Sequence, residues 1–103
     1  MYLVREVMYC KPGKVRAMVD KFIAMSKLGE KSGLPKMRVM TDFCAEQYWT
    51  VVAEMEVPSV QAFVDMMSAP AGSGDDQKAM EKIMKDYHEL IDHGKREIFK
   101  IEG

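Results

Sequence analysis

The chain has 103 residues, of which 48% are hydrophobic and 30% charged, as expected for one domain with a modest core. Its 15 basic and 16 acidic residues are interspersed and leave a net charge of -1, so the basic surface of a nucleic-acid-binding protein is missing. No apolar run approaches the ~18 residues of a membrane span, and the first residues resemble a strand rather than a secretory signal. We therefore expect a cytoplasmic protein without membrane or nucleic-acid partners.

The first two predicted elements are a strand and an amphipathic helix. Tyr2–Cys10 is rich in β-branched and aromatic residues, as strands are, and Pro12 and Gly13 end it. From Lys14 to about Lys31, apolar residues recur with the spacing of one helix face. That face consists of Val15, Met18, Val19, Phe22, Ile23 and Met25.

Two further strands are close enough in sequence to pair as an antiparallel hairpin. Lys36–Asp42 is the second predicted strand, Phe43–Glu46 the connection, and Gln47–Val57 the third strand. The third strand carries apolar side chains on both faces. The face expected to meet the helices holds Trp49, Val51, Ala53, Met55 and Val57. The other face begins with Tyr48, Thr50 and Val52 and continues into Glu54 and Glu56.

A short helix and a loop follow the third strand. Ser59 is a typical N-cap residue, which predicts a helix that begins at Val60. The segment Ser68–Gln77 is rich in Gly, Ser and Asp, so we expect a mobile surface loop that could act as a lid.

A longer helix and the fourth strand complete the predicted elements. Asp75 or Asp76 caps a helix that we expect to run to about Asp92, until Gly94 stops it. The fourth strand is Lys95–Ile101. The buried face of this helix is expected to hold Met80, Ile83, Met84, Tyr87, Leu90 and Ile91.

The order of elements, β-α-β-β-α-β, predicts an α+β fold with the ferredoxin-like split βαβ topology in a single domain over residues 1–103. Right-handed crossovers place the first and third strands in the centre of a four-stranded antiparallel sheet, with the helices on one face. The other face carries apolar residues that this chain cannot cover, and large uncovered patches are uncommon on monomers. We therefore expect a homodimer whose sheets pair face to face, with Tyr48, Thr50 and Val52 in the contact.

Three segments resemble the dimeric α/β-barrel superfamily, in particular its NIPSNAP-like and antibiotic-biosynthesis monooxygenase-like domains. Residues 10–14 (CKPGK) are similar to the end of the first strand of NIPSNAP-like domains, and residues 48–52 (YWTVV) and 56–63 (EVPSVQAF) to the third strand and the following helix. The resemblance implies a dimeric α/β barrel. Members of this superfamily include cofactor-free oxygenases, haem-degrading enzymes and isomerases, and also many proteins with no known activity. Haem-degrading members place a Trp where this chain has Met66 and an Asn near Val7, so we expect no cofactor.

A ligand site is expected in the space between the sheet and the helices. His88 borders the apolar stripe of the last helix, where an imidazole could act as a general base. The wall of a pocket for a flat hydrophobic molecule would be formed by Trp49, Tyr87, Met66 and Met84. The alternative is that these side chains fill the core and that His88 only hydrogen-bonds water or backbone.

Two arginines are candidates for binding an anionic group. Arg5 and Arg38 lie on predicted strands, and a guanidinium that faces a cavity can bind a carboxylate or a phenolate. Alternatively, each arginine pairs with a carboxylate on a strand. The carboxylates available for this are Glu54, Glu56 and Glu97.

The sequence contains no obvious reactive constellation. No Ser-His-Asp set, phosphate-binding loop, dinucleotide fingerprint or metal-ligand cluster is visible, and Cys10 and Cys44 are expected to be free thiols. We therefore expect a homodimeric binding or interaction module with a pocket for a small hydrophobic ligand. The alternative is a cofactor-free monooxygenase or isomerase that acts on a hydrophobic or aromatic small molecule.

Overall fold

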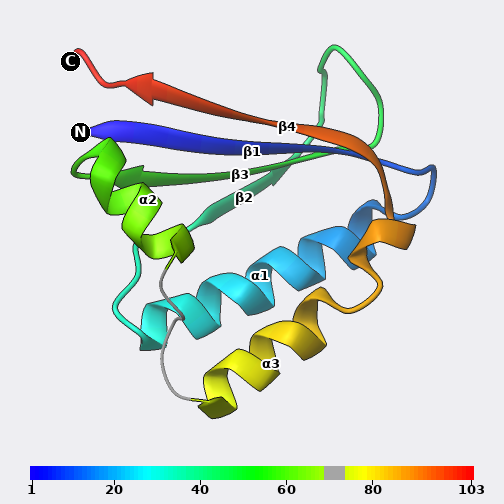
Figure 1. The fold of residues 1–103 in the computed structure, drawn as a ribbon. Helices are drawn as coiled ribbons and strands as arrows, with labels where there is room; N and C mark the ends of the chain where they lie inside the picture. Colours follow the sequence, from blue (N-terminus) through cyan, green and yellow to red (C-terminus); the bar gives the residue numbers. More distant parts are fainter. Residues whose placement is uncertain (69–73) are drawn as a thin grey trace.

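The computed structural model describes residues 1–68 and 74–103, which contain four strands and four helical segments (Figure 1). In chain order these are β1 (Tyr2–Cys10), α1 (Val15–Lys31), β2 (Arg38–Thr41), β3 (Thr50–Val57), α2 (Val60–Ser68), α3 (Gly74–Met84), the short 3₁₀ helix η1 (Tyr87–Glu89) and β4 (Ile91–Lys100). The strands form one antiparallel sheet in the order β2-β3-β1-β4. The predicted ferredoxin-like α+β fold is confirmed, with β1 and β3 in the centre of the sheet.

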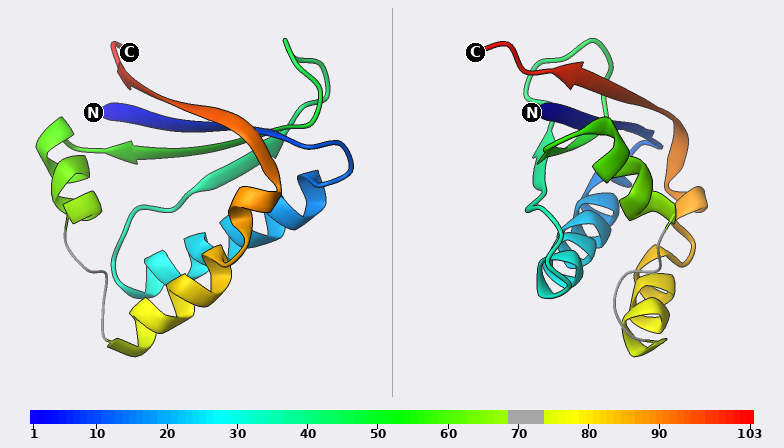
Figure 2. Two further views of the ribbon diagram at one scale, coloured as in Figure 1. Left: turned by 45° about the vertical axis from the view of Figure 1, so that its right-hand side comes forward. Right: turned by 60° about the vertical axis from the view of Figure 1, so that its left-hand side comes forward.

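The helices lie on one side of the sheet (Figure 2). α1 contacts β2 and β3, α2 contacts β3, and α3 contacts α1. No helix from the described residues covers the other side, which we call the open face. Cross-strand neighbours share a face, so the pairing register defines this surface. It consists of Leu3, Arg5, Val7 and Tyr9 from β1, Arg38 and Met40 from β2, Thr50, Val52, Glu54 and Glu56 from β3, and His93, Lys95, Glu97 and Phe99 from β4.

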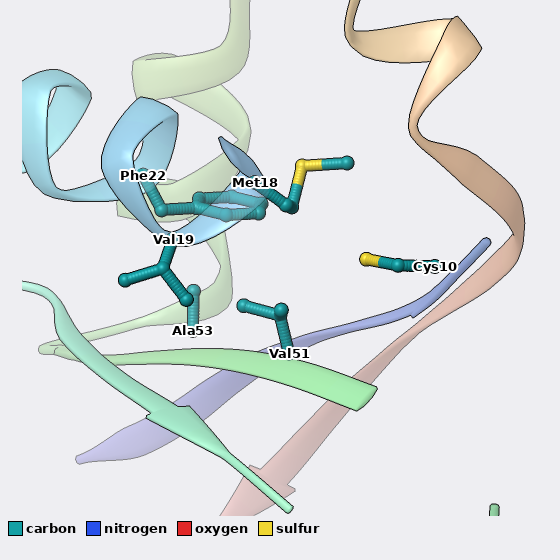
Figure 3. Packing of buried hydrophobic residues seen from close by; sticks show 6 residues of the cluster. All are labelled: Cys10, Met18, Val19, Phe22, Val51 and Ala53. Atoms are coloured by element: carbon teal, nitrogen blue, oxygen red, sulfur yellow. The ribbon is translucent and has the colours of Figure 1, made fainter. Parts of the chain in front are cut away.

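The core lies between the sheet and α1 (Figure 3). The larger buried cluster consists of Cys10, Met18, Val19, Phe22, Val51 and Ala53. A second cluster of Val4, Val57 and Phe63 joins α2 to the end of β3. Burial of a large apolar side chain contributes about 1.5–3 kcal/mol, so these two clusters are the main source of stability in the isolated chain.

The prediction of one helix from Asp75 or Asp76 to about Asp92 is wrong. α3 ends at Met84, and η1 and β4 occupy the rest of the predicted helix. The break lies at Asp86, whose φ of 65° is left-handed and cannot continue a right-handed helix. Lys21 stabilises the end of α3, because its Nζ donates hydrogen bonds to the carbonyls of Ile83 and Lys85 at 2.8 and 2.7 Å.

The prediction that Gly94 stops a helix is wrong. Gly94 lies inside β4, opposite Met8 of β1. The fourth strand therefore begins four residues earlier than predicted, at Ile91. A glycine within a strand often marks a close approach of neighbouring groups. Here a Cβ at Gly94 would lie 3.0 Å from both the Met8 sulfur and the Val7 carbonyl oxygen.

The hairpin between β2 and β3 has shorter strands and a longer connection than predicted. β2 covers only Arg38–Thr41, and β3 begins at Thr50 rather than at Gln47. The Thr50 amide donates a hydrogen bond to the Asp42 carboxylate at 2.9 Å, which closes the loop of residues 42–49. Trp49 has a φ of 61°, so the chain leaves the extended conformation just before β3.

The predicted sides of the third strand are confirmed within β3. Val51, Ala53 and Val57 are buried on the helix side, whereas Trp49 lies outside the strand and is 43% exposed. The N-cap is also confirmed, because the Ser59 hydroxyl accepts a hydrogen bond from the Ala62 amide at 3.0 Å.

The predicted lid loop lies partly within helices. Ser68 belongs to α2, and residues 74–77 form the first turn of α3. The remaining residues of the predicted loop, 69–73, lie outside the described residues.

Candidate functional site

Four charged side chains form a single row across the open face. The pairing register places Glu97, Arg5, Glu54 and Arg38 side by side on β4, β1, β3 and β2. Arg5 Nε lies 2.8 Å from Glu54 Oε2 and Arg5 Nη1 lies 3.1 Å from Glu97 Oε1. Arg38 Nη2 donates to Glu54 Oε1 at 3.0 Å. We call these four residues the charge row.

The charge row bears out the prediction that the two arginines pair with strand carboxylates. The Glu54 side chain is only 12% exposed and accepts from both arginines, so it is the centre of the row. Arg5 is 31% exposed and has a carboxylate on each side, whereas the Arg38 side chain is 74% exposed. The Arg5 guanidinium is therefore paired with Glu54 and Glu97 and is not available to bind an external anion.

The loop of residues 42–49 stands on the open-face side of the sheet (Figure 1). It carries large side chains that are exposed: Phe43 entirely, Tyr48 to 86% and Trp49 to 43%. Between this loop and the strands lies a small hollow of about 150 Å³. Thr50 is buried at its edge, with its hydroxyl donating to the Gln47 carbonyl, and Val52 is half-buried beside it.

A second hollow lies on the helix side, where β1 and β4 meet η1. Its volume is about 320 Å³. We call it the helix-side hollow; its lining is Glu6, Met8, Tyr87, His88, Ile91, Gly94, Lys95 and Arg96. The rings of Tyr87 and His88 are in contact, with centroids 4.0 Å apart.

Arg96 brings a positive charge to the helix-side hollow. Its Nε donates to the Glu6 carboxylate, and its guanidinium carbon lies 5.2 Å from the centre of the Phe63 ring. A guanidinium has five N–H donors, and Arg96 has no further partner among the described residues. The arginine is thus held in place and keeps donors available for a ligand.

The structure brings only part of the predicted pocket together. Tyr87 and His88 share the helix-side hollow, although His88 lies in η1 and not in a long helix. Met66 packs against the second core cluster, and Met84 is the last residue of α3. Trp49 lies in the loop before β3, outside the lining of the helix-side hollow.

Sequence reasoning missed Glu6 and Arg96. Both lie on the helix side of their strands and face each other in the β1–β4 register. The available signal was the alternation of Gly94, Arg96 and Ile98, which places a charged residue on the apolar side of β4.

The two cysteines are both free but differ in environment. Cys10 is buried in the larger core cluster and Cys44 is exposed. Burial raises the pKa of the Cys10 thiol. The described residues contain no group of three or more potential metal ligands, and none of their helices is long and apolar enough to cross a membrane.

We expect Cys44 to react with iodoacetamide at pH 8 at the rate of an accessible thiol, and Cys10 at least about 100-fold more slowly. The reason is that Cys10 is both inaccessible and protonated to higher pH. Because the unfolded chain loses this proton first, Cys10 also reduces stability as pH rises through the usual thiol range. Peptide mass spectrometry measures both rates, with denatured protein as the control. Fast labelling of folded Cys10 would contradict its burial.

Comparisons with known proteins place the chain by fold. No family model and no curated protein sequence matches it. A NIPSNAP family protein from Agrobacterium tumefaciens has a TM-score of 0.76 at 10% identity, over 99% of this chain and 94% of that one. A protein described as a candidate antibiotic biosynthesis monooxygenase from Chloroflexus aurantiacus has a TM-score of 0.64 at 14% identity, over 99% and 94%.

A dimeric ferredoxin-like protein of unknown function from Thermobifida fusca is also similar. Its TM-score is 0.52 at 17% identity, over 98% of this chain and 92% of that one. At such identities the similarity shows a common fold and nothing about activity. The resemblance drawn from the sequence is thereby confirmed for the fold.

Proposed function

We propose that the protein is a homodimeric domain that binds a hydrophobic small molecule in the helix-side hollow. The observation that carries this proposal is the combination of an apolar wall from Met8, Tyr87 and Ile91 with a cation, Arg96, and an imidazole, His88. Ligand sites typically combine apolar walls with a few polar groups that orient the ligand. The hollow therefore suits a molecule with an aromatic or aliphatic body and one acidic group.

The homodimer is supported by the uncovered open face. Leu3, Val52, Met40 and Phe99 give this face apolar side chains that are partly or fully exposed between its charges. A second copy would cover them without blocking the helix-side hollow, because the two lie on opposite sides of the sheet. The similar protein from Thermobifida fusca is described as dimeric.

The binding proposal is tested by a thermal-shift screen with phenols, quinols and aromatic carboxylates. A ligand at 100 times its dissociation constant adds about 2.7 kcal/mol to stability, which raises the melting temperature measurably. We expect the His88→Gln variant to lose this shift. The matched control is His93→Gln, because His93 lies against Tyr9 on the open face. If no compound shifts the wild type, or His88→Gln responds as the wild type does, the proposal fails.

A second function, a cofactor-free isomerase or monooxygenase, is favoured by the presence of His88 in the same hollow as Arg96. In an isomerisation, His88 would remove a proton from one carbon of the ligand and return it to another, so nothing is consumed. Arg96 would hold the anion formed in between. A monooxygenase would instead need O₂ to react with the deprotonated ligand, so that one oxygen atom replaces two hydrogens on the ligand carbon and the other leaves with them as water. Product formation lowered at least about 100-fold by His88→Gln distinguishes an enzyme from a binding protein.

A further inference from the structure

The two aromatic side chains of the helix-side hollow come from a short bridge of chain between α3 and β4. Tyr87 and His88 lie in η1, and their rings contact each other at the wall of the hollow. η1 consists of three residues, none of them buried. The position of the two rings therefore depends on how the ends of this bridge are held.

The end that leads into β4 is held by backbone hydrogen bonds. The Leu90 carbonyl accepts a hydrogen bond from the Lys11 amide at 2.8 Å, and β4 pairs with β1 from Ile91 onward. This end of the bridge is thus fixed to the sheet.

The other end depends on α3, which is held less firmly. None of its residues is buried, and it packs on α1 rather than on the sheet (Figure 1). Its backbone closes weakly, because the Lys85 amide lies 3.4 Å from the Lys82 carbonyl oxygen. Asp86 then turns the chain towards η1 with its left-handed φ of 65°. The start of η1 therefore needs an attachment from another element.

Lys21 of α1 provides this attachment. Its Nζ donates hydrogen bonds to the carbonyl oxygens of Ile83 and Lys85 at 2.8 and 2.7 Å. The last carbonyls of a helix lack partners within it, and the negative end of the helix dipole favours a cation there. The neighbouring residue Phe22 is buried in the larger core cluster, so the ammonium is carried by a helix that the core holds in place.

We propose that Lys21 is a positioning residue of the helix-side hollow, which holds Tyr87 and His88 at the wall although it is not part of the lining. For what the hollow binds, this proposal rests on the proposed function; for the placement of the two rings it does not. A ligand that contacts both rings binds more tightly when they are already in position. By linkage, the same ligand must stabilise the attachment of α3 to Lys21.

The first test needs no ligand and uses Lys21→Met. Methionine keeps an unbranched side chain and a high helix preference but has no N–H donor. In carbon–proton NMR spectra the His88 ring signal should move, because the ring lies 4.0 Å from that of Tyr87, while the His93 signal from the open face should stay. The amides of Glu89 and Leu90, which bond within the bridge, should exchange with solvent at least about 10-fold faster.

Two further variants serve as controls for the first test. Lys27→Met changes an exposed lysine of the same helix that has no hydrogen bond or ion pair in the part of the chain that the structure describes, and it should leave the His88 signal in place. Lys21→Arg keeps the charge and the donors and should retain the wild-type signal and exchange rates.

The first test decides the placement of the rings. Unchanged exchange in β1 and β3 shows that Lys21→Met is folded. If it does not fold, Lys21→Gln gives the same comparison, because its shorter side chain cannot reach both carbonyls. A His88 signal that is unmoved in the folded variant would overturn the proposal.

The second test measures binding of those phenols and aromatic carboxylates that raise the melting temperature of the wild type. If Tyr87 and His88 are in position about a tenth of the time in Lys21→Met, the dissociation constant rises about 10-fold. Lys27→Met should bind as the wild type does. An equal dissociation constant in the wild type and Lys21→Met would overturn the positioning role and leave the proposed function intact. If no compound binds the wild type, the proposed function fails, and the His88 signal alone decides whether Lys21 places the two rings.

Discussion

Replacement of Phe22 by alanine is expected to lower the free energy of unfolding by about 3–5 kcal/mol, a large part of the 5–15 kcal/mol typical of a domain. Phe22 is 3% exposed and projects from α1 into the larger core cluster beside Val19 and Ala53 (Figure 3). Its removal leaves a cavity between the helix and the sheet that the β-strand backbone cannot close. The loss is therefore greater than the transfer free energy of the ring alone.

The neighbouring residue Ile23 provides a matched control for this variant. Ile23 lies on the same helix but is 40% exposed, so Ile23→Ala should cost less than about 1 kcal/mol. Urea unfolding followed by circular dichroism measures both values, at one protein concentration because a dimer makes stability depend on concentration. Equal losses in the two variants would mean that α1 does not pack with the observed face on the sheet.

This pair shows what helix periodicity can and cannot predict. Both Phe22 and Ile23 belong to the apolar stripe that the sequence places on α1, and the stripe correctly includes the buried Met18 and Val19. The stripe is wider than the part of α1 that the sheet covers. Which of two adjacent apolar residues is buried depends on how the helix lies on the sheet, and that angle is set by residues distant in sequence.

The end of α3 shows why the last helix was predicted too long. Tyr87, Leu90 and Ile91 continue the apolar spacing of the helix, and all three do pack against the core cluster. They reach it from η1, from its C-cap residue Leu90 and from β4 rather than from one helix, because the left-handed backbone at Asp86 redirects the chain. Aspartate tolerates that conformation, but its presence alone does not predict it. Periodicity therefore identified three partly buried residues that contact the core and misassigned their secondary structure, while Met80, Ile83 and Met84 on α3 are only half-buried.

Contacts within the sheet could be predicted from the sequence better than contacts between the sheet and a helix. The pairing of Arg5 with Glu54 follows from strand alternation, because a central strand offers few partners on each face. The contact of Arg96 with Glu6 and Phe63 needs the exact neighbours of β4 and the position of α2. The prediction that Trp49 lies on the helix side of the third strand was wrong, since its positive φ removes it from the alternation of the strand that it precedes.

The second large effect is expected at Gly94. A methyl group there would lie 3.0 Å from the Met8 sulfur and 3.0 Å from the Val7 carbonyl oxygen. Gly→Ala normally favours a strand by about 0.5–1 kcal/mol, yet Gly94→Ala should destabilise the protein by about 1–3 kcal/mol through this overpacking. Gly74→Ala is the control, because a Cβ at Gly74 meets nothing within 4 Å. Thermal unfolding of both variants tests the difference.

A double-mutant cycle with Met8→Ala separates the two contacts at Gly94. The Met8 side chain is flexible and removable, whereas the Val7 carbonyl belongs to the backbone of β1 and cannot be moved without disturbing the ladder. In the Met8→Ala background the cost of Gly94→Ala should fall by about 1 kcal/mol but not vanish. An unchanged cost would assign the strain to the backbone contact alone, and a stabilising Gly94→Ala in the single variant would contradict the close approach of β1 and β4.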